Sequence, residues 1–297
     1  MVKHDVAIAF PGQGIQKPGM ASPIIDSAAW RLFDEASELV NYDLGKLVLN
    51  GPAEALNNTA YAQVAIFVTC FALWELNKER FEPSIFLGHS LGEITALAAA
   101  GALTFTDAVR LVQARGDIMT ESIPGGMVAI IGLDSTSIHE LCVKEQARRF
   151  VQISNENSPA QTVVSGTVEG LELLANLARE NGAKRVVPLN VSGPFHSRLM
   201  EPAAEKFSLV VEQLNLSPCH VPVLSNDGET LLHTPEMIRS ELVAQLTSPV
   251  RFTQAVHKLA ELGIKEFIEV SPESVLISLA RRTEGNLQFT LVSNGGI

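Results

Sequence analysis

The chain has 297 residues, of which 46% are hydrophobic and 19% are charged, and its formal net charge is -11. Such a chain is long enough to bury a sizeable core, either as one large domain or as a domain that carries a smaller inserted one. The acidic balance argues against nucleic acid as a partner, because an acidic surface without a basic stripe repels phosphate.

No segment predicts a membrane span, a secretion signal or a metal site. The longest apolar block, residues 64–74, is shorter than the roughly 20 residues that cross a bilayer. Residues 1–10 include Asp5 and lack the long apolar stretch of a signal peptide. The three cysteines are spaced too widely for a disulfide framework or a metal site: Cys70, Cys142 and Cys219. We therefore expect a cytoplasmic protein with no membrane contact and no bound metal.

The first part of the chain alternates short apolar strands with helices. We expect strands over residues 6–10 and 84–87. Helices are expected over residues 28–40, 60–77 and 92–100, and from a cap at Thr106-Asp107 to about Met119. This alternation predicts an α/β fold with a largely parallel sheet.

The middle of the chain has a different pattern, which begins after Pro124-Gly125-Gly126. The expected order is strand, helix, strand, strand, helix, strand, over residues 127–131, 136–148, 151–155, 161–165, 168–181 and 185–189. That order is typical of a ferredoxin-like unit. We therefore predict a small domain at residues 124–191, inserted into a large domain of residues 1–123 and 192–297. The last part returns to helices and short strands, including a helix over 255–262 and a strand over 266–270.

The strongest local motif is Gly88-His89-Ser90-Leu91-Gly92, a G-x-S-x-G pattern between a predicted strand and a predicted helix. In that context the serine lies on a sharp turn that exposes its hydroxyl, and side chains two residues away on either side would clash. The first N–H groups of the helix, that of Leu91 included, then point at whatever binds there. The alternative is an ordinary turn, but the context favours Ser90 as a nucleophile.

A serine nucleophile requires a general base, and His196 is the best candidate among the seven histidines. It lies in a loop set by glycine and proline, and it follows Ser90 in the chain as in α/β-hydrolases. No acidic residue stands out as its orienting partner. Asp227 is a candidate, but its surroundings equally predict a turn. A carbonyl oxygen is the alternative orienting group. We expect His89 to have a supporting role at most.

Two further segments give weaker signals. Gly12-Gln13-Gly14 follows the first strand and is not a dinucleotide-binding fingerprint. Its glycines let the backbone approach a ligand, which makes the Gln13 N–H a candidate oxyanion donor, although the pattern alone favours a plain loop. Arg115 carries a planar guanidinium that suits a carboxylate, although its spacing alone favours a solvated arginine near a helix end.

Together these motifs resemble those of the malonyl-CoA:acyl carrier protein transacylases, a family that includes the enzyme of fatty acid synthesis and the acyltransferases of polyketide synthases. The matching segments follow one order over nearly the whole chain: residues 10–14, 88–93, 113–116, 155–166, 193–197 and 243–250. The resemblance implies an α/β-hydrolase-like large domain with an inserted ferredoxin-like small domain. One departure is at residues 271–276, where the family often has a Gly-Pro-Gly turn, and it leaves the geometry of that turn open.

The resemblance also implies the catalytic roles. Ser90 would be the nucleophile and His196 the base, with the main-chain carbonyl of Gln245 orienting the histidine. The backbone N–H groups of Gln13 and Leu91 would form the oxyanion hole.

Substrate binding is implied in the same way. Arg115 would hold the malonyl carboxylate, with His89, Phe195 and Asn157 as further substrate-binding residues. Phe195 resembles the malonyl-selecting form of its motif, because a ring there crowds the α-methyl group of a methylmalonyl unit.

The implied reaction is a ping-pong transfer of malonyl from malonyl-CoA, through acyl-Ser90, to the phosphopantetheine thiol of an acyl carrier protein. It implies no cofactor of the enzyme's own and serves polyketide or fatty acid biosynthesis. The general character of residues 101–119 favours a discrete polyketide acyltransferase that acts in trans. One alternative is an acyl hydrolase that removes stalled acyl groups from carrier proteins, and Arg115 argues against it. The other alternative is an inactive relative that only docks a carrier protein, and the presence of Ser90 and His196 argues against it.

Docking of an acidic carrier protein to an acidic chain requires a local positive patch. Three basic pairs are candidates, although each alone equally fits a solvated face: Arg148-Arg149, Lys184-Arg185 and Arg281-Arg282.

Overall fold

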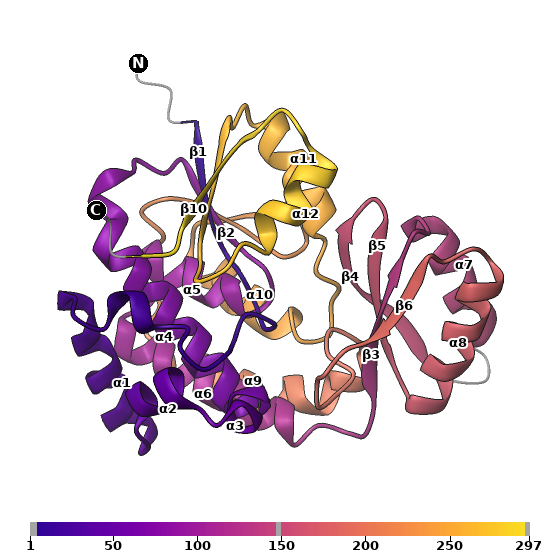
Figure 1. Ribbon diagram of the computed structural model, residues 1–297, viewed down its shortest axis with the longest axis horizontal. Coiled ribbons are helices and arrows are strands. Elements are labelled where there is room, and N and C mark those ends of the chain that lie inside the picture. The colour runs from indigo at the N-terminus through magenta and orange to yellow at the C-terminus, as the bar shows by residue number, and fades with distance from the viewer. Residues whose placement is uncertain (1–4, 147–149, 295–297) are drawn as a thin grey trace.

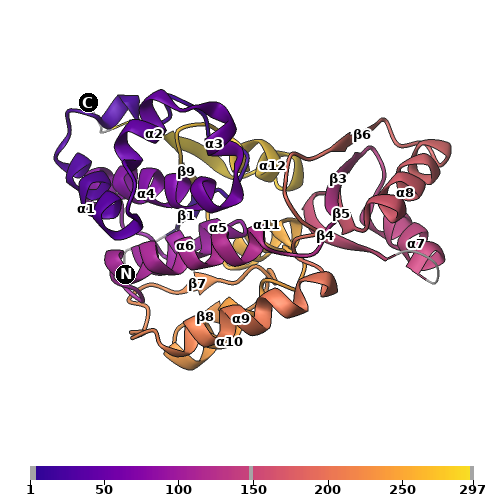
Figure 2. The ribbon, with the colours of Figure 1, turned by 90° about the horizontal axis from the view of Figure 1, so that it is seen from below.

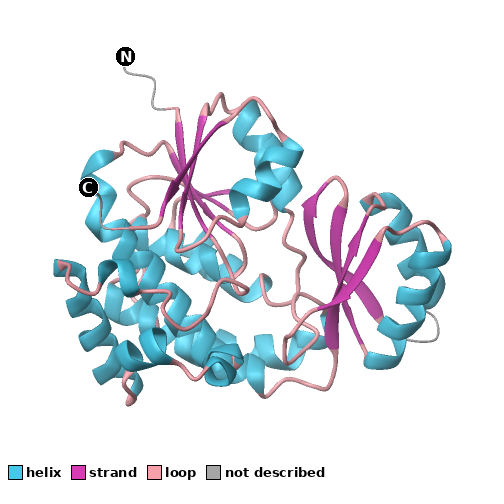
Figure 3. Cartoon of the chain, in the orientation of Figure 1, coloured by secondary structure: helices cyan, strands magenta, loops and turns pink. Residues whose placement is uncertain are grey.

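The computed structural model describes residues 5–146 and 150–294. Two parts lie side by side, a larger one built on a six-stranded sheet and a smaller one built on a four-stranded sheet (Figure 1). The strands are β1 (Val6–Phe10), β2 (Ile85–Gly88), β3 (Gly126–Ile131), β4 (Val151–Ser158), β5 (Gln161–Gly166), β6 (Arg185–Pro188), β7 (Val223–Leu224), β8 (Leu231–Leu232), β9 (Glu266–Val270) and β10 (Gln288–Val292). Helices flank both sheets (Figure 3).

The α-helices are distributed along the whole described chain. They are α1 (Arg31–Val40), α2 (Leu44–Asn50), α3 (Ala53–Asn57), α4 (Thr59–Asn77), α5 (Leu91–Ala99), α6 (Phe105–Thr120), α7 (Ser135–Gln146), α8 (Val168–Glu180), α9 (Glu201–Glu212), α10 (Pro235–Ala244), α11 (Phe252–Glu261) and α12 (Leu276–Thr283).

The large sheet has the strand order β10-β9-β1-β2-β7-β8, and all neighbours are parallel except β7 and β8. Its central strand β1 is apolar on both faces, as in buried parallel sheets. Ile8 and Phe10 belong to the core shared with α4, α5 and α6. Ala7 and Ala9 point the other way, into the core formed with α11 and α12. The prediction of a largely parallel α/β sheet is confirmed.

Helix α4 is apolar on all sides and buried along most of its length. Together with the following turn, the segment Thr59–Arg80 is long and apolar enough to cross a membrane by length and composition alone. It passes that test because it extends beyond the apolar block of residues 64–74. Its most apolar window is, however, 78% buried inside the protein, which is the environment of a core helix.

The small sheet has the strand order β4-β5-β3-β6, and all neighbours are antiparallel. Helices α7 and α8 pack on the face that points away from the larger part (Figure 2). Ile130, Val164 and Leu174 are among the side chains that fill the core between them. The element order and the antiparallel sheet are those of the predicted ferredoxin-like unit. The predicted domain limits enclose this sheet and stay a prediction.

A short stretch of the larger part pairs with the edge of the small sheet. The Val250 N–H donates to the Ser154 carbonyl at 2.8 Å, and the Glu156 N–H donates to the Val250 carbonyl at 2.9 Å. Val250 thereby pairs with β4 in a parallel bridge, opposite Asn155. The polar end of β4 therefore lies at the candidate active site, where Asn155 and Asn157 line the cavity.

Several local predictions need correction. The helix predicted over 28–40 begins as a 3-10 turn, and α1 starts only at Arg31. The cap of α6 is Thr104, whose hydroxyl accepts the Asp107 N–H, and not Thr106-Asp107. The departure at residues 271–276 has its own solution. The buried carboxylate of Glu269 accepts the N–H groups at the start of α12: Val275, Leu276 and Ile277.

Candidate active site

Ser90 lies on a sharp turn between β2 and α5. Its φ of 52° and ψ of -111° are strained for a residue with a side chain. The flanking glycines make this turn possible. A Cβ on Gly88 would lie 1.9 Å from the backbone of Gly92, and one on Gly92 would lie 2.0 Å from the Phe10 carbonyl oxygen. The turn thus requires both glycines, for the physical reason that the motif predicts.

Three strands of the large sheet end at this site. Gln13 follows β1, Ser90 follows β2 and Asn226 follows β7. Ligand sites of open α/β sheets form at the carboxyl ends of the strands. Asn226 supports the turn, because its side-chain oxygen accepts the Ser90 N–H at 2.9 Å. Its own N–H donates to Glu93 Oε1 at 2.7 Å. Sequence reasoning missed both Asn226 and Glu93.

The His196 ring lies between the nucleophile and two backbone carbonyls. Its Nε2 is 2.7 Å from Ser90 Oγ, while its Nδ1 lies 2.8 Å from the Gln245 carbonyl and 3.1 Å from that of Ser248. Because carbonyls only accept, Nδ1 carries the proton and Nε2 is free to accept one from the serine. Burial, aided by the nearby Arg115, lowers the pKa of His196 to about 3, so the ring is neutral near pH 7.

Asp227, the acidic alternative to a carbonyl, does not orient His196. Its carboxylate accepts the N–H groups of Glu229 and Thr230 and the Thr230 hydroxyl. These bonds hold a local turn, which is the other interpretation that its surroundings allow.

Arg115 is buried beside the nucleophile, with 1% of its surface exposed. The spacing alone favours a solvated arginine near a helix end, and that interpretation is wrong. It donates to Ser90 Oγ at 3.2 Å, to Gln245 Oε1 at 2.7 Å and to Gln63 Oε1 at 2.9 Å. Burial lowers its pKa to about 10, against the opposing effect of Glu93, so the guanidinium stays charged near pH 7. Gln63, which fixes one end of the guanidinium, was not predicted.

A cavity of about 150 Å³ opens over Ser90 and His196. Its apolar wall includes Met119, Met127, Val163, Leu189, Val191 and Phe195. Its polar wall includes Asn157, whose Oδ1 lies 2.8 Å from His89 Nε2. Desolvation lowers the pKa of His89, which keeps its ring neutral. Three of the four predicted substrate-binding residues, His89, Asn157 and Phe195, thus line the cavity, and the fourth, Arg115, contacts the nucleophile without lining it.

The two predicted oxyanion donors also border the site. Gln13 lines the cavity, and Leu91 is the first residue of α5. Within the described residues, neither backbone N–H donates to a protein acceptor. Free N–H groups of this kind are available to an oxyanion. The Gln13 side chain is turned toward Thr59 Oγ1, at 3.5 Å.

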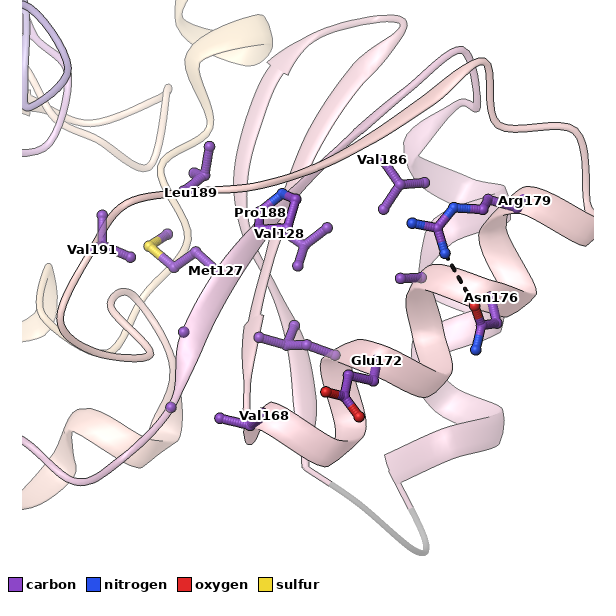
Figure 4. A pocket seen from close by; sticks show the side chains of 14 residues that line it. Met127, Val128, Val168, Glu172, Asn176, Arg179, Val186, Pro188, Leu189 and Val191 are labelled. Atoms are coloured by element: carbon purple, nitrogen blue, oxygen red, sulfur yellow. Dashed lines mark hydrogen bonds between the residues drawn. The ribbon is translucent and has the colours of Figure 1, made fainter.

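A neighbouring hollow of about 540 Å³ lies along the small sheet and α8 (Figure 4). It shares Met127, Leu189 and Val191 with the cavity over Ser90. Its far end carries Arg179, which donates to Asn176 at 3.0 Å. This hollow contains none of the predicted catalytic residues. Among the residues described here, no three His, Cys, Asp or Glu side chains cluster as metal ligands.

Comparison with known proteins places this arrangement in a family. The acyl transferase domain matches residues 8–290. A malonyl CoA-acyl carrier protein transacylase of Bacillus subtilis is 44% identical over 296 residues, which cover 97% of this chain and 93% of the relative. The chain belongs to the malonyl-CoA:acyl carrier protein transacylase family. The transacylase is accordingly an acyltransferase, as predicted.

Solved structures of similar proteins confirm the fold class of the transacylase. An acyl carrier protein S-malonyltransferase from Vibrio cholerae superposes with a TM-score of 0.94 at 37% identity, covering 98% of this chain and 97% of that one. A malonyl-transacylase in complex with a type II polyketide synthase acyl carrier protein gives a TM-score of 0.95 at 38% identity, with 98% and 96% of the two chains covered.

Proposed function

We propose that this transacylase moves a malonyl group from malonyl-CoA to the phosphopantetheine thiol of an acyl carrier protein, through an ester on Ser90. The observation that carries the proposal is the arrangement around the Ser90 hydroxyl. A neutral, carbonyl-oriented His196 lies 2.7 Å from the hydroxyl oxygen, and the charged Arg115 lies 3.2 Å from it. A base and a carboxylate-binding group therefore converge on one nucleophile.

In the first half-reaction, Ser90 Oγ attacks the thioester carbonyl carbon and its proton moves to His196 Nε2. The carbonyl oxygen becomes an oxyanion, which the Gln13 and Leu91 N–H groups stabilise. Collapse of this intermediate breaks the C–S bond, and the coenzyme A sulfur leaves with the proton from His196. The malonyl group remains as an ester on Ser90.

The second half-reaction reverses these steps with a new thiol. The phosphopantetheine thiol of the carrier gives its proton to His196 Nε2 and attacks the ester carbonyl. Ser90 Oγ then leaves and takes that proton back. The carbonyls of Gln245 and Ser248 keep the ring in one tautomer in both halves. No cofactor takes part in this scheme.

The small cavity and the buried arginine support malonyl as the acyl group. Arg115 offers a charged donor pair to the free carboxylate while the thioester carbon lies at Ser90. Phe195 is 3% exposed and lines the cavity, where its ring crowds an α-substituent. A ring of this kind discriminates against one methyl group by a factor of about 10 to 200.

An acyl carrier protein is the proposed acceptor, in the cytoplasm and in polyketide or fatty acid biosynthesis. One relative of known structure is itself in complex with a type II polyketide synthase carrier. Two of the predicted basic docking pairs, Lys184-Arg185 and Arg281-Arg282, are exposed. The third, Arg148-Arg149, lies outside the described residues.

The proposal is tested by intact-protein mass spectrometry. The protein is exposed briefly to malonyl-CoA, acetyl-CoA or methylmalonyl-CoA and then mixed with a pantetheinylated carrier protein. We expect a malonyl adduct that maps to Ser90 and passes to the carrier, and little adduct from methylmalonyl-CoA. The Ser90→Ala variant is the control and should form none.

The alternative function, hydrolysis of stalled acyl groups, predicts a different result in the same experiment. A hydrolase would form no stable malonyl adduct and would release acyl groups from a preloaded carrier into water. That outcome would replace the transfer proposal.

A further inference from the structure

The side chain of Gln245 connects Arg115 to Glu93, whereas its main-chain carbonyl contacts His196. Its carbonyl orients His196, as proposed above, but its side-chain Oε1 accepts from Arg115 at 2.7 Å. Its Nε2 donates to Glu93 Oε2 at 2.5 Å and to the Ser90 carbonyl at 3.3 Å. Gln245 itself is 2% exposed, so no solvent replaces these partners.

Glu93 decides which way the Gln245 amide faces. An amide has one donating and one accepting end, and each end here meets a partner of fixed character. Burial raises the pKa of Glu93 to about 8, while the N–H groups of Asn226 and Gln245 favour its carboxylate form. Because both of its oxygens accept N–H groups, Glu93 requires the NH₂ end of the amide. The guanidinium of Arg115 only donates, so it requires the oxygen. The reversed amide would place oxygen against carboxylate and NH₂ against guanidinium, both buried, which is costly.

The second oxygen of Glu93 supports the nucleophile separately. It accepts the Asn226 N–H at 2.7 Å, and the Asn226 side chain in turn accepts the Ser90 N–H at 2.9 Å. Glu93 is completely buried in the first turn of α5, between these two partners. Its carboxylate therefore connects Asn226, which holds the Ser90 N–H, to Gln245, which holds Arg115.

We propose that Glu93 is a positioning residue for substrate selection, which fixes the Gln245 amide and thereby keeps Arg115 directed at the carboxylate of the acyl group. The inference rests on the proposed function, because it assigns Arg115 to a dicarboxylic acyl donor. Glu93 touches neither substrate nor the reacting atoms. It acts through Gln245, and its effect is greatest on donors that carry a free carboxylate.

The test compares malonyl-CoA with acetyl-CoA, which lacks the carboxylate, as donors for acylation of Ser90. In Glu93→Gln the amide oxygen still accepts the Asn226 N–H, but the NH₂ group faces the NH₂ of Gln245. We expect kcat/KM for malonyl-CoA to fall about 10-fold or more relative to that for acetyl-CoA, the scale of a hydrogen bond to a charged group. Equal losses for the two donors would overturn the inference.

A second variant keeps Glu93 and the main-chain carbonyl and removes only the amide. Gln245→Met should lower the malonyl-to-acetyl ratio in the same direction, and it carries the test if Glu93→Gln fails to fold. In the double variant, Glu93→Gln should cause no further loss in that ratio, because its route through the amide is already absent. Additive losses would show that Glu93 acts independently of Gln245, which contradicts the inference.

Glu269→Gln is the matched control. Glu269 is also completely buried, but its carboxylate accepts backbone N–H groups at α12, away from the site. It should lower thermal stability and leave the malonyl-to-acetyl ratio unchanged, and a changed ratio would overturn the specific role of Glu93. Wild-type protein that forms an acetyl but no malonyl adduct would overturn the proposed function itself, and this result is distinct from any result with the variants.

Discussion

His196 is oriented by backbone carbonyls and not by a carboxylate, and this choice sets its charge. A carboxylate at Nδ1 would stabilise the imidazolium and raise the pKa of the ring. The carbonyls of Gln245 and Ser248 accept hydrogen bonds from the Nδ1–H group without adding a full negative charge. The burial of the ring, together with the smaller effect of Arg115 nearby, disfavours the charged form. The resting base is therefore a neutral imidazole whose Nε2 is ready to accept a proton.

This charge state predicts how acylation depends on pH. Protonation of Nε2 would stop His196 from accepting the Ser90 proton, and a histidine with the ordinary pKa of 6.5 would lose half its activity there. Because the pKa of His196 lies well below that value, acylation by acetyl-CoA, which has no carboxylate for Arg115 to bind, should stay nearly constant from about pH 7.5 down to about pH 5. Single-turnover rates across this range test it, and a half-loss near the ordinary value would contradict it.

Arg115 predicts a loss that depends on the acyl donor. Arg115→Ala should lower kcat/KM for malonyl-CoA by about 100-fold, the upper range for a charged hydrogen-bonding group. The kcat/KM for acetyl-CoA should fall much less. Arg110→Ala, an exposed arginine on the same helix α6, is the control and should change neither donor. Malonyl transfer that survives Arg115→Ala would remove the arginine from substrate selection.

At the scale of elements, the site depends on how closely β1, β2 and α5 approach one another. Gly92 at the start of α5 lies against the end of β1, and Gly88 ends β2 against the first turn of α5. This close packing holds Ser90 in its strained conformation, and Asn226 secures the Ser90 N–H from β7. The nucleophile is thus held by three neighbouring strand ends.

This packing predicts a severe effect of a single methyl group. Gly88→Ala would put a Cβ 1.9 Å from the Gly92 backbone, so β2 and α5 must separate. We expect loss of the malonyl adduct on Ser90 and a lower melting temperature. Gly126→Ala is the matched control, because its Cβ would meet only Leu171 Cδ1 at 3.6 Å, an ordinary contact. An active Gly88→Ala protein would contradict the steric account of the turn.

For the whole molecule, the two sheets are joined where the catalytic groups meet. Val250 pairs with β4, two residues after Ser248, whose carbonyl contacts His196. At a second contact, Arg282 on α12 lies 3.4 Å from Gln161 at the start of β5. The small sheet thus supplies Asn157 and one wall of the cavity, the large sheet supplies Ser90, and His196 lies in the loop between β6 and α9.

Carrier recognition belongs to this scale, because it involves surfaces remote from Ser90. Reversing both charges in Lys184→Glu/Arg185→Glu should raise KM for an acidic carrier protein and weaken its salt dependence, because charge pairs there steer association. The rate of acylation by malonyl-CoA should not change. The same reversal at Arg281 and Arg282 tests the other exposed pair. An unchanged KM for the carrier would exclude the reversed pair from the docking surface.

Sequence alone predicted the elements that carry their own local pattern. The turn at Ser90, the first strand and the ferredoxin-like order each depend on glycine spacing or periodicity, and the described elements lie within a few residues of those predicted. The four strands and two helices of the small unit were recognisable because each is a continuous local segment. Helices such as α2, α3, α9 and α10 were not singled out.

The partners of the catalytic groups were harder to predict, because they come from distant segments. Asn226 meets Ser90 across 136 residues, and Gln63 meets Arg115 across 52. Asn226 lies in a turn whose sequence offers its neighbour Asp227 as the acidic candidate. Glu93 did leave a signal, since it is the one charged residue in the apolar helix α5. A lone charge in a buried helix requires a polar partner, which points to a site.

The position of β1 in the large sheet has a consequence for how the chain is made. β1 leaves the ribosome long before β9, one of its two neighbours in the sheet, which begins only at Glu266. At synthesis rates of about 5–20 residues per second, that edge of β1 waits on the order of ten seconds or more for its partner. Throughout this interval an apolar strand edge is available for wrong pairing. The newborn chain is therefore most exposed to aggregation before β9 has been made, and chaperone protection would matter most then.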